Sequence, residues 1–118
     1  VISSGKFAHT GSFEALLGAD SSDPEKRKKQ SLEFQVTTDT PPTFLWHTVT
    51  DDCVPVENSL LFFEASHKYK VPVELHLYPT GVHGLSLANE ETCHEDGGCI
   101  QPECQSWMEL ACTWIRNL

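Results

Sequence analysis

At 118 residues the chain is the size of one small domain, and with 39% hydrophobic and 21% charged residues it can build a core, which excludes a disordered tail. A net charge of -9 and a pI near 4.9 argue against a nucleic-acid partner, because the one basic cluster, residues 26–29, is expected to be a solvated helix face. No apolar run approaches the ~20 residues that cross a bilayer, so no membrane partner is expected.

The first third of the chain predicts a strand end followed by two short helices. Val1–Gly5 is typical of a buried strand that runs into a turn. Residues 12–17 predict a short helix that ends at a glycine, which suits the left-handed backbone of a helix end. Asp23 can cap a second helix over residues 24–32, and Pro24 can occupy its first position.

The remaining elements predict a parallel sheet. Residues 43–48 form a short, almost wholly apolar strand, the kind found in parallel sheets covered on both faces by helices. A helix is expected over residues 56–70, an alternating strand over 73–78 and a last helix over 105–118. The stretch between the two strands is long enough for the right-handed crossover that joins parallel strands. The fold class is therefore α/β.

The loops that follow the two strands carry the residues suited to catalysis, because such loops meet at one edge of an open α/β sheet. The first loop contains Asp51 and Asp52, and the second contains His83 among glycines. A carboxylate that accepts the Nδ1 proton of a histidine fixes the tautomer and stabilises the imidazolium formed during acyl transfer. His83 and a carboxylate of the first loop, Asp51 or Asp52, are the predicted catalytic pair, expected within hydrogen-bond reach, although the alternatives of a turn residue and a structural loop histidine stay open.

Four stretches, residues 40–47, 51–59, 78–79 and 81–84, resemble the C-terminal third of acetyl-esterase and lipase-like α/β-hydrolases, relatives of the prolyl-oligopeptidase catalytic domain. The shared pattern is Asp-x-x-Val-Pro followed by His-Gly, and the final helix with its two tryptophans also matches. The resemblance implies that residues 1–118 are the C-terminal portion of one doubly wound, mostly parallel α/β-hydrolase domain. The Asp-x-x-Val-Pro pattern implies Asp51 as triad acid and His83 as triad base, in the chain order of this fold, and leaves Asp52 as a turn residue or a charge near the following helix.

The resemblance further implies hydrolysis of a small-molecule carboxylic ester, often on an acylated sugar, without a cofactor or a metal. The sequence contains no Gly-x-Ser-x-Gly, since the nearest look-alike, Ser3-Ser4-Gly5, lacks the first glycine, and the oxyanion-hole motif is missing too. We therefore expect the nucleophile upstream of Val1, in a full-length serine esterase, and this chain alone to be inactive. A sheet cut beside Phe44–Trp46 is expected to bind that missing part or a second copy, so the chain should not be an isolated monomer.

Five cysteines, an odd number, do not suggest a complete disulfide framework, and with no export signal visible, free thiols in the cytoplasm are expected. Three of the cysteines and His94 fall within Cys93–Cys104. A zinc site, a local disulfide and an insertion loop with free thiols are all open, and the last is favoured because the spacings are looser than in a zinc knuckle. Replacing these cysteines is expected to change stability by no more than ~0.5 kcal/mol.

Two other functions compete with an esterase. A non-catalytic, truncated hydrolase-fold domain used for binding or assembly agrees with the missing nucleophile, and a small metal-binding module agrees with the Cys/His loop. Of the remaining histidines, His47 is expected to be packed and hydrogen-bonded at the end of a buried strand, while His67 and His76 support no functional role.

Overall fold

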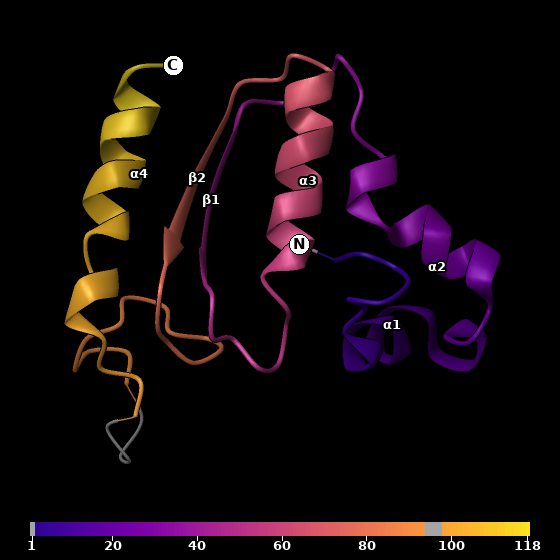
Figure 1. The fold of residues 1–118 in the computed structure, drawn as a ribbon, viewed down its shortest axis with the longest axis horizontal. Helices are drawn as coiled ribbons and strands as arrows, with labels where there is room; N and C mark the ends of the chain where they lie inside the picture. Colours follow the sequence, from indigo (N-terminus) through magenta and orange to yellow (C-terminus); the bar gives the residue numbers. More distant parts are fainter. Residues whose placement is uncertain (1, 94–97) are drawn as a thin grey trace.

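A computed structural model describes residues 2–93 and 98–118 (Figure 1). Its helices and strands are α1 (Thr10–Leu17), α2 (Pro24–Gln30), β1 (Thr43–Thr48), α3 (Glu57–Lys68), β2 (Val73–Tyr78) and α4 (Trp107–Arg116), with 3₁₀ turns at Gly18–Asp20, Leu32–Phe34 and Pro102–Cys104. Both strands have the predicted bounds, and each helix ends within two residues of its predicted range. No helix in the described ranges combines the length and the apolar character needed to span a membrane.

The two strands pair in parallel, in a register that runs from Thr43 opposite Val73 to Thr48 opposite Tyr78. Helix α3 makes the crossover between them and lies on one side of the strands, whereas α4 lies on the other (Figure 1). The carboxyl ends of parallel strands share one edge of the sheet. The loops that follow β1 and β2 therefore lie side by side.

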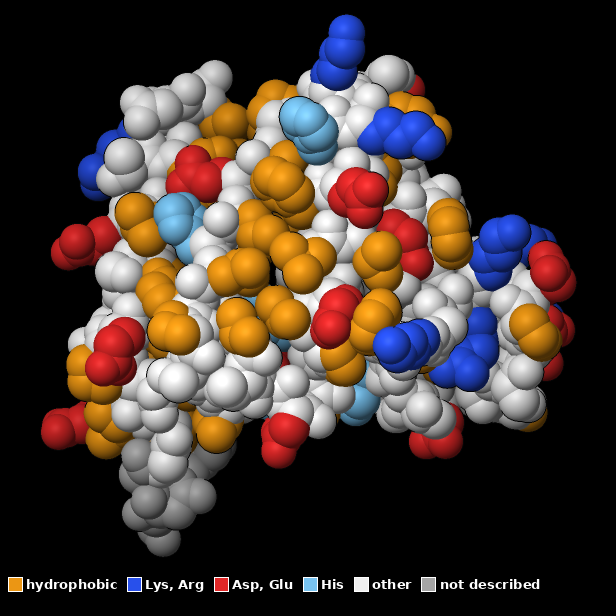
Figure 2. All heavy atoms as spheres, in the orientation of Figure 1, with side chains coloured by type: hydrophobic (Ala, Val, Ile, Leu, Met, Phe, Trp, Pro, Cys, Tyr) orange, Lys and Arg blue, Asp and Glu red, His pale blue; other side chains and the backbone are white. Residues whose placement is uncertain are grey.

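Alternate side chains of β1 face the two helical layers. The ring of His47 meets Ser59 of α3, whereas Trp46 stacks on Trp107 of α4 with ring centroids 5.2 Å apart. Most residues of both strands are only half-buried, in contrast to the strand covered on both faces that was predicted for residues 43–48. The reason is that the sheet has only two strands among the described residues, so each strand keeps an open edge. Figure 2, drawn in the orientation of Figure 1, shows hydrophobic side chains gathered on the face toward the viewer, over the strands and between them and α3.

The predicted strand at Val1–Gly5 is wrong for the part of it that the structure describes. Val1 lies outside the described residues, and residues 2–5 pair with neither strand of the sheet. Instead, the N–H of Ser3 donates to Oδ1 of Asn58 at 2.9 Å, and Ser3 is fully buried. The apolar residues at the start of the chain led to the prediction of a buried strand, but they do not show which group the backbone of the segment bonds to.

Asn58 ties this N-terminal segment to the start of α3. Besides accepting from Ser3, it donates through Nδ2 to the carbonyl oxygens of Phe7 and Pro55, both at 2.9 Å. A buried amide satisfied on both its oxygen and its nitrogen fixes the geometry around it, because each unmade bond would leave a buried polar group unpaired. The segment before α1 is thereby held next to the loop that follows β1.

The loop after β2 builds a small core against the sheet. Leu85, Ala88 and Cys104 are buried there, and Trp46 and Tyr78 of the strands pack against them. Burial raises the pKa of the Cys104 thiol, and the nearby negative charge of the preceding glutamate adds to the effect. The expectation that every cysteine of this region is replaceable at surface cost stays a prediction, and the burial of Cys104, which is 0% exposed, weighs against it.

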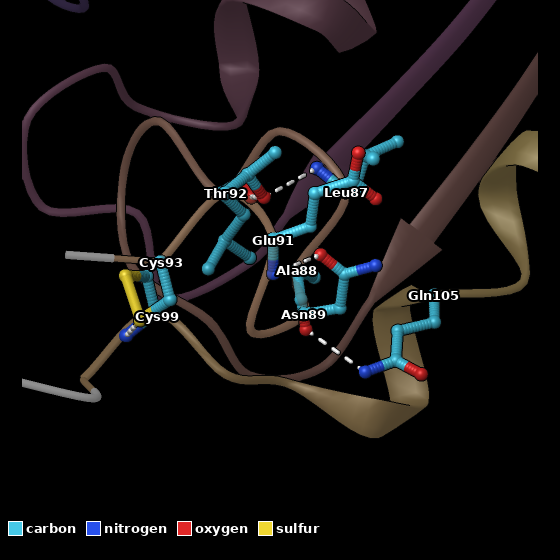
Figure 3. Close-up of a disulfide and its surroundings, with 9 residues drawn as sticks. Leu87, Ala88, Asn89, Glu91, Thr92, Cys93, Cys99 and Gln105 are labelled. Carbon is cyan, nitrogen blue, oxygen red and sulfur yellow. Dashed lines mark hydrogen bonds between the residues drawn. A yellow bond between two sulfur atoms is a disulfide. The ribbon is translucent and has the colours of Figure 1, made fainter.

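Cys93 and Cys99 form a disulfide, with their Cα atoms 5.2 Å apart (Figure 3). The favoured interpretation of a loop with free thiols is therefore wrong for this pair, whereas Cys53, Cys104 and Cys112 are free. Close to the disulfide, Leu87 N–H donates to Thr92 Oγ1, and Gln105 Nε2 donates to Ala88 O (Figure 3). The described residues contain no cluster of three or more potential metal ligands, and His94 lies outside them.

Replacing both Cys93 and Cys99 by serine is expected to lower the free energy of unfolding by about 2 kcal/mol. The disulfide closes a loop with a sequence separation of 6, and the chain-entropy relation gives about 2 kcal/mol for a ring of this size. Urea denaturation of the oxidised protein and of the double variant measures the difference. The matched control is Cys112→Ser, at an exposed free thiol, which should leave the urea midpoint unchanged. Equal midpoints for all three proteins would contradict the prediction.

Candidate active site

Asp51 is held in a turn directly after β1. Its N–H donates to Thr48 O at 3.2 Å, and its Oδ1 accepts the N–H groups of Cys53 at 3.0 Å and Val54 at 2.8 Å. A short acidic side chain can bond the backbone two and three residues ahead in this way. The carboxylate is therefore locked by its own loop, and only 7% of the side chain is exposed.

Two threonines join this turn to the loop that follows β2. Thr48 Oγ1 and Thr50 Oγ1 donate to Gly81 O at 3.1 and 3.0 Å, and Gly81 N–H donates to Thr50 Oγ1 at 2.9 Å. Gly81 has a φ of 151°, and a Cβ there would come within 2.5 Å of the Thr48 side chain. Only glycine fits without a shift of the backbone. This contact fixes the spacing between the two loops.

Asp51 and His83 meet across these loops. Oδ2 of Asp51 lies 2.9 Å from Nδ1 of His83, which confirms that the two residues lie side by side. Because the ionised carboxylate can only accept, Nδ1 carries the proton and Nε2 of the half-exposed ring is left to accept another. Asp52, the adjacent carboxylate, is exposed and is not the partner in this contact.

The hydrogen bonds to Asp51 favour its charged form. Burial alone would raise the pKa of this carboxyl group. The bonds from the Val54 N–H, from His83 and from the Cys53 N–H, together with the charge on His83, outweigh burial and hold the pKa below its ordinary value of 3.8. The site therefore keeps a carboxylate opposite the imidazole at neutral pH.

This lowered pKa predicts how stability depends on pH. A carboxyl group whose folded pKa lies below its unfolded pKa contributes stability above about pH 4, and that contribution is lost as the pH falls through the folded pKa. Urea midpoints measured from pH 7 down to pH 3 should fall more steeply for the wild type than for Asp51→Asn. The exposed neighbour gives the control, since Asp52→Asn should retain the steep fall. Parallel curves for wild type and Asp51→Asn would contradict the prediction.

A cavity of about 440 Å³ opens beside the pair. Its lining comes from α1, β1, α3 and both loops, and includes His9, Ser12, His47, Ser59, Val82, Gly84 and Ser86 in addition to Asp51 and His83. A cavity with convergent polar groups beside a carboxylate–imidazole pair is the expected form of an active site in an open α/β sheet.

His9 also lines this cavity, although no feature of the sequence predicted a role for it. It caps α1, with Nδ1 accepting the N–H of Ser12 at 3.2 Å, so Nε2 carries the proton in the neutral ring. Nε2 lies 3.5 Å from Sγ of Cys53, in the Asp51 loop. The usual caps are Ser, Thr, Asp and Asn, so a histidine before a helix is a weak signal. Thr48 and Thr50 were missed for a similar reason, because threonine is ordinary at a strand end.

Comparison with known proteins decides the family. The model of the family described as "Prolyl oligopeptidase family" matches residues 9–96, which include both loops of the site. The chain belongs to the prolyl oligopeptidase family. The match spans well over half of the chain and contains Asp51 and His83.

Relatives within and around this family agree with the fold. The chain is 46% identical to the endo-1,4-beta-xylanase B of Butyrivibrio fibrisolvens over 91 residues, which are 77% of the chain. The structure of an acetyl ester-xyloside bifunctional hydrolase from Caldicellulosiruptor lactoaceticus covers 99% of the chain at 45% identity, with a TM-score of 0.82. A carboxylesterase from Lactobacillus plantarum covers 81% at 31% identity, with a TM-score of 0.74. The parallel pair of strands with its helices is thus part of an α/β-hydrolase fold, as predicted.

The chain spans only part of each relative. It corresponds to 14% of the xylanase, 39% of the acetyl ester-xyloside hydrolase and 34% of the carboxylesterase. The activities of those whole proteins are therefore only proposals for this member of the prolyl oligopeptidase family.

The serines that line the cavity are Ser12, Ser59 and Ser86. Oγ of Ser12 bonds to Nδ1 of His9, and Oγ of Ser59 bonds to Nδ1 of His47, both at 2.8 Å. Ser86 is exposed, and none of the contacts seen within the described ranges joins any of these three hydroxyl groups to His83. The geometry of this prolyl oligopeptidase family chain thus presents an acid and a base, and in the described residues no serine is bonded to that base.

The other histidines behave as the sequence indicated. His47 is packed and hydrogen-bonded, to Ser59 and to the carbonyl oxygen of Val54. His76 pairs with Glu74 at 2.7 Å on β2. His67 is exposed at the last turn of α3, where its ring stacks on that of Phe63.

Proposed function

We propose that the chain supplies the acid and the base of a Ser-His-Asp triad to a carboxylic-ester hydrolase, whose serine lies outside these 118 residues. The observation that carries the proposal is the 2.9 Å contact between Asp51 Oδ2 and His83 Nδ1 at the mouth of a cavity. The names of the related structures, a carboxylesterase and an acetyl ester-xyloside hydrolase, support the reaction class. We call the chain together with its nucleophile-bearing part the assembled enzyme.

In the first half of the reaction, Nε2 of His83 takes the proton of the serine hydroxyl as its oxygen attacks the ester carbonyl. The imidazolium then returns that proton to the departing alcohol, which leaves an acyl-serine. In the second half His83 takes a proton from a water as the water oxygen bonds to the acyl carbon. The acyl–serine bond then breaks, the proton passes from His83 to the serine oxygen, and the carboxylic acid leaves. Throughout, Asp51 stays ionised and keeps the proton of His83 on Nδ1, for which its lowered pKa suits it.

Acetyl esters of sugars are the proposed substrates. The argument rests on the two relatives of highest identity given above, one described as an acetyl ester-xyloside hydrolase and the other as a xylanase. An acetyl group needs little room beside the pair, whereas the sugar would extend over the open rim of the cavity, which is lined by polar as well as apolar groups. The carboxylesterase relative agrees with the ester bond but not with any particular alcohol.

The proposed partner is the nucleophile-bearing part of the same enzyme, placed along the free edge of β1. In the described residues β1 pairs with β2 alone, and Leu45, Trp46 and His47 of β1 also line the cavity. Unpaired strand edges recruit a further strand. A strand added there would enter the sheet beside the cavity, so that its carboxyl end would approach His83. A second copy of the chain is the alternative occupant of this edge.

A cytoplasmic location stays a prediction. The Cys93–Cys99 disulfide weighs against it, because disulfides are rare in reducing compartments.

The assembled enzyme is expected to release acetate from acetylated xylo-oligosaccharides. The release should be abolished by His83→Ala and left unchanged by His76→Ala, since His76 bonds to Glu74 on β2 and not to the site. Acetate is measured enzymatically against time. Activity that survives His83→Ala would contradict the triad, whereas an enzyme that hydrolyses other esters but not these would contradict the substrate class alone.

A further inference from the structure

The ring of His47 approaches the same carboxylate oxygen that His83 uses. Nε2 of His47 lies 3.4 Å from Oδ2 of Asp51, and Nδ1 of His83 lies 2.9 Å from that atom. The side chain of His47 is 12% exposed and that of Asp51 is 7% exposed, so little water can take over these contacts. The described proton-transfer scheme uses Asp51 and His83 but gives His47 no part.

The neighbours of His47 fix which of its nitrogens carries the proton. Nε2 lies 2.9 Å from the carbonyl oxygen of Val54, which can only accept, so Nε2 is the donor. Nδ1 lies 2.8 Å from Oγ of Ser59, a buried hydroxyl on α3 that can donate to it. The neutral ring thus donates its one N–H to Val54 O, and the same nitrogen lies 3.4 Å from Asp51 Oδ2.

The peptide groups of Val54 connect His47 to the Asp51 carboxylate. The peptide N–H of Val54 donates to Oδ1 of Asp51 at 2.8 Å, while the carbonyl of Val54 accepts from His47. His47 is therefore linked to the Asp51 carboxylate through the peptide of Val54, and its ring also lies beside the oxygen that accepts from His83.

We infer that His47 is a positioning residue for the proposed ester hydrolysis. Its Nε2–H holds the Val54 carbonyl, and the N–H of Val54 holds Oδ1 of Asp51, so that the carboxylate faces Nδ1 of His83. His47 does not touch the reacting atoms and exchanges no proton during the reaction. Ser59, from the neighbouring helix, fixes the tautomer that makes this possible. The inference rests on the proposed function, because positioning of Asp51 matters for turnover only if His83 is the base.

The test compares three substitutions in the assembled enzyme. His47→Leu removes the donor at similar size, and we expect kcat to fall about 10- to 100-fold, the scale of a small misplacement of a catalytic group, with KM nearly unchanged. His47→Gln can place an amide N–H near the position of Nε2, and it should restore most of the lost kcat. His76→Leu, at a histidine on the neighbouring strand, should leave kcat as it is. If His47→Leu does not fold, Ser59→Ala, which frees the tautomer, should give a smaller loss of kcat with the same unchanged KM.

A spectroscopic measurement separates this inference from the proposed function. The Nδ1 proton of His83, bound to a carboxylate, should give a low-field proton resonance that persists in the wild type and in His47→Gln. In His47→Leu this resonance should broaden or be lost, whether or not the protein hydrolyses esters. An inactive wild type that shows this pattern would overturn the proposed function but not the positioning role. An unaltered resonance and an unaltered kcat in folded His47→Leu, or a His47→Gln variant as impaired as His47→Leu, would overturn the positioning role.

Discussion

Asp51→Asn is expected to lower kcat of the assembled enzyme about 10⁴-fold, the loss seen when a triad aspartate becomes an amide. Asparagine keeps the size of the side chain and can keep the bonds from Cys53 and Val54 to its carbonyl oxygen. Its amide nitrogen then faces Nδ1 of His83 and donates to it, which drives the imidazole proton to Nε2. A ring protonated at Nε2 cannot take the proton of the serine. Initial rates of acetate release measure the effect.

The control for this prediction is Asp52→Asn, which changes the same charge one residue away on an exposed side chain. It should leave kcat within about twofold of the wild type, as expected of a surface residue without a partner in the reaction. Urea denaturation near pH 7 shows that each variant is folded before its rate is compared. If Asp52→Asn caused the large loss, or if Asp51→Asn retained full turnover, the assignment of the triad acid would be wrong.

The contact between Asp51 and His83 could be predicted from the sequence because it follows from topology. The two strands and the long crossover between them indicate a parallel pair, and parallel strands deliver their following loops to one edge. The choice of Asp51 over Asp52 came from the Asp-x-x-Val-Pro pattern of the resembled family, and the structure shows the Asp51 carboxylate bonded to the N–H groups two and three residues ahead. Topology thus predicted which loops meet, and the resemblance predicted which carboxylate faces His83.

The parts that sequence reasoning missed depend on which distant residues meet. The buried amide of Asn58 bonds to Ser3 and Phe7, more than 50 positions earlier in the chain. The local sequence of α3 does not predict these bonds. Similarly, the spacing of Cys93 and Cys99 did not distinguish free thiols from a local disulfide, and the structure shows the pair bonded. His47 was predicted as a packed residue, but its approach to Asp51 depends on the tight turn after β1.

The 118-residue chain alone is expected to take up no label from a fluorophosphonate, the reagent that modifies activated serines. It should hydrolyse esters at least about 10⁶-fold more slowly than the assembled enzyme, the scale of losing a triad nucleophile. The reason is that no serine lining the cavity is bonded to His83, the histidine that Asp51 orients: Ser12 and Ser59 bond to His9 and His47 instead, and Ser86 has no bond to His83 among the contacts of residues 2–93 and 98–118. The sequence also contains no Gly-x-Ser-x-Gly that would bring a nucleophile to this edge of the sheet.

Mixing the chain with its separately produced nucleophile-bearing part should restore both labelling and turnover, with the label on the added part. Restoration requires a strand along the free edge of β1, so it should be accompanied by a stable 1:1 complex in light scattering. The control is a mixture with the His83→Ala chain, which should form the same complex without recovering turnover, because His83 makes its contact with Asp51 and not with the strand edge. Among the serines lining the cavity, Ser86 is exposed and nearest in sequence to His83, so it is the serine to test if the chain alone takes up label. Stoichiometric labelling of the chain alone, lost in Ser86→Ala, would show that the 118 residues carry their own nucleophile.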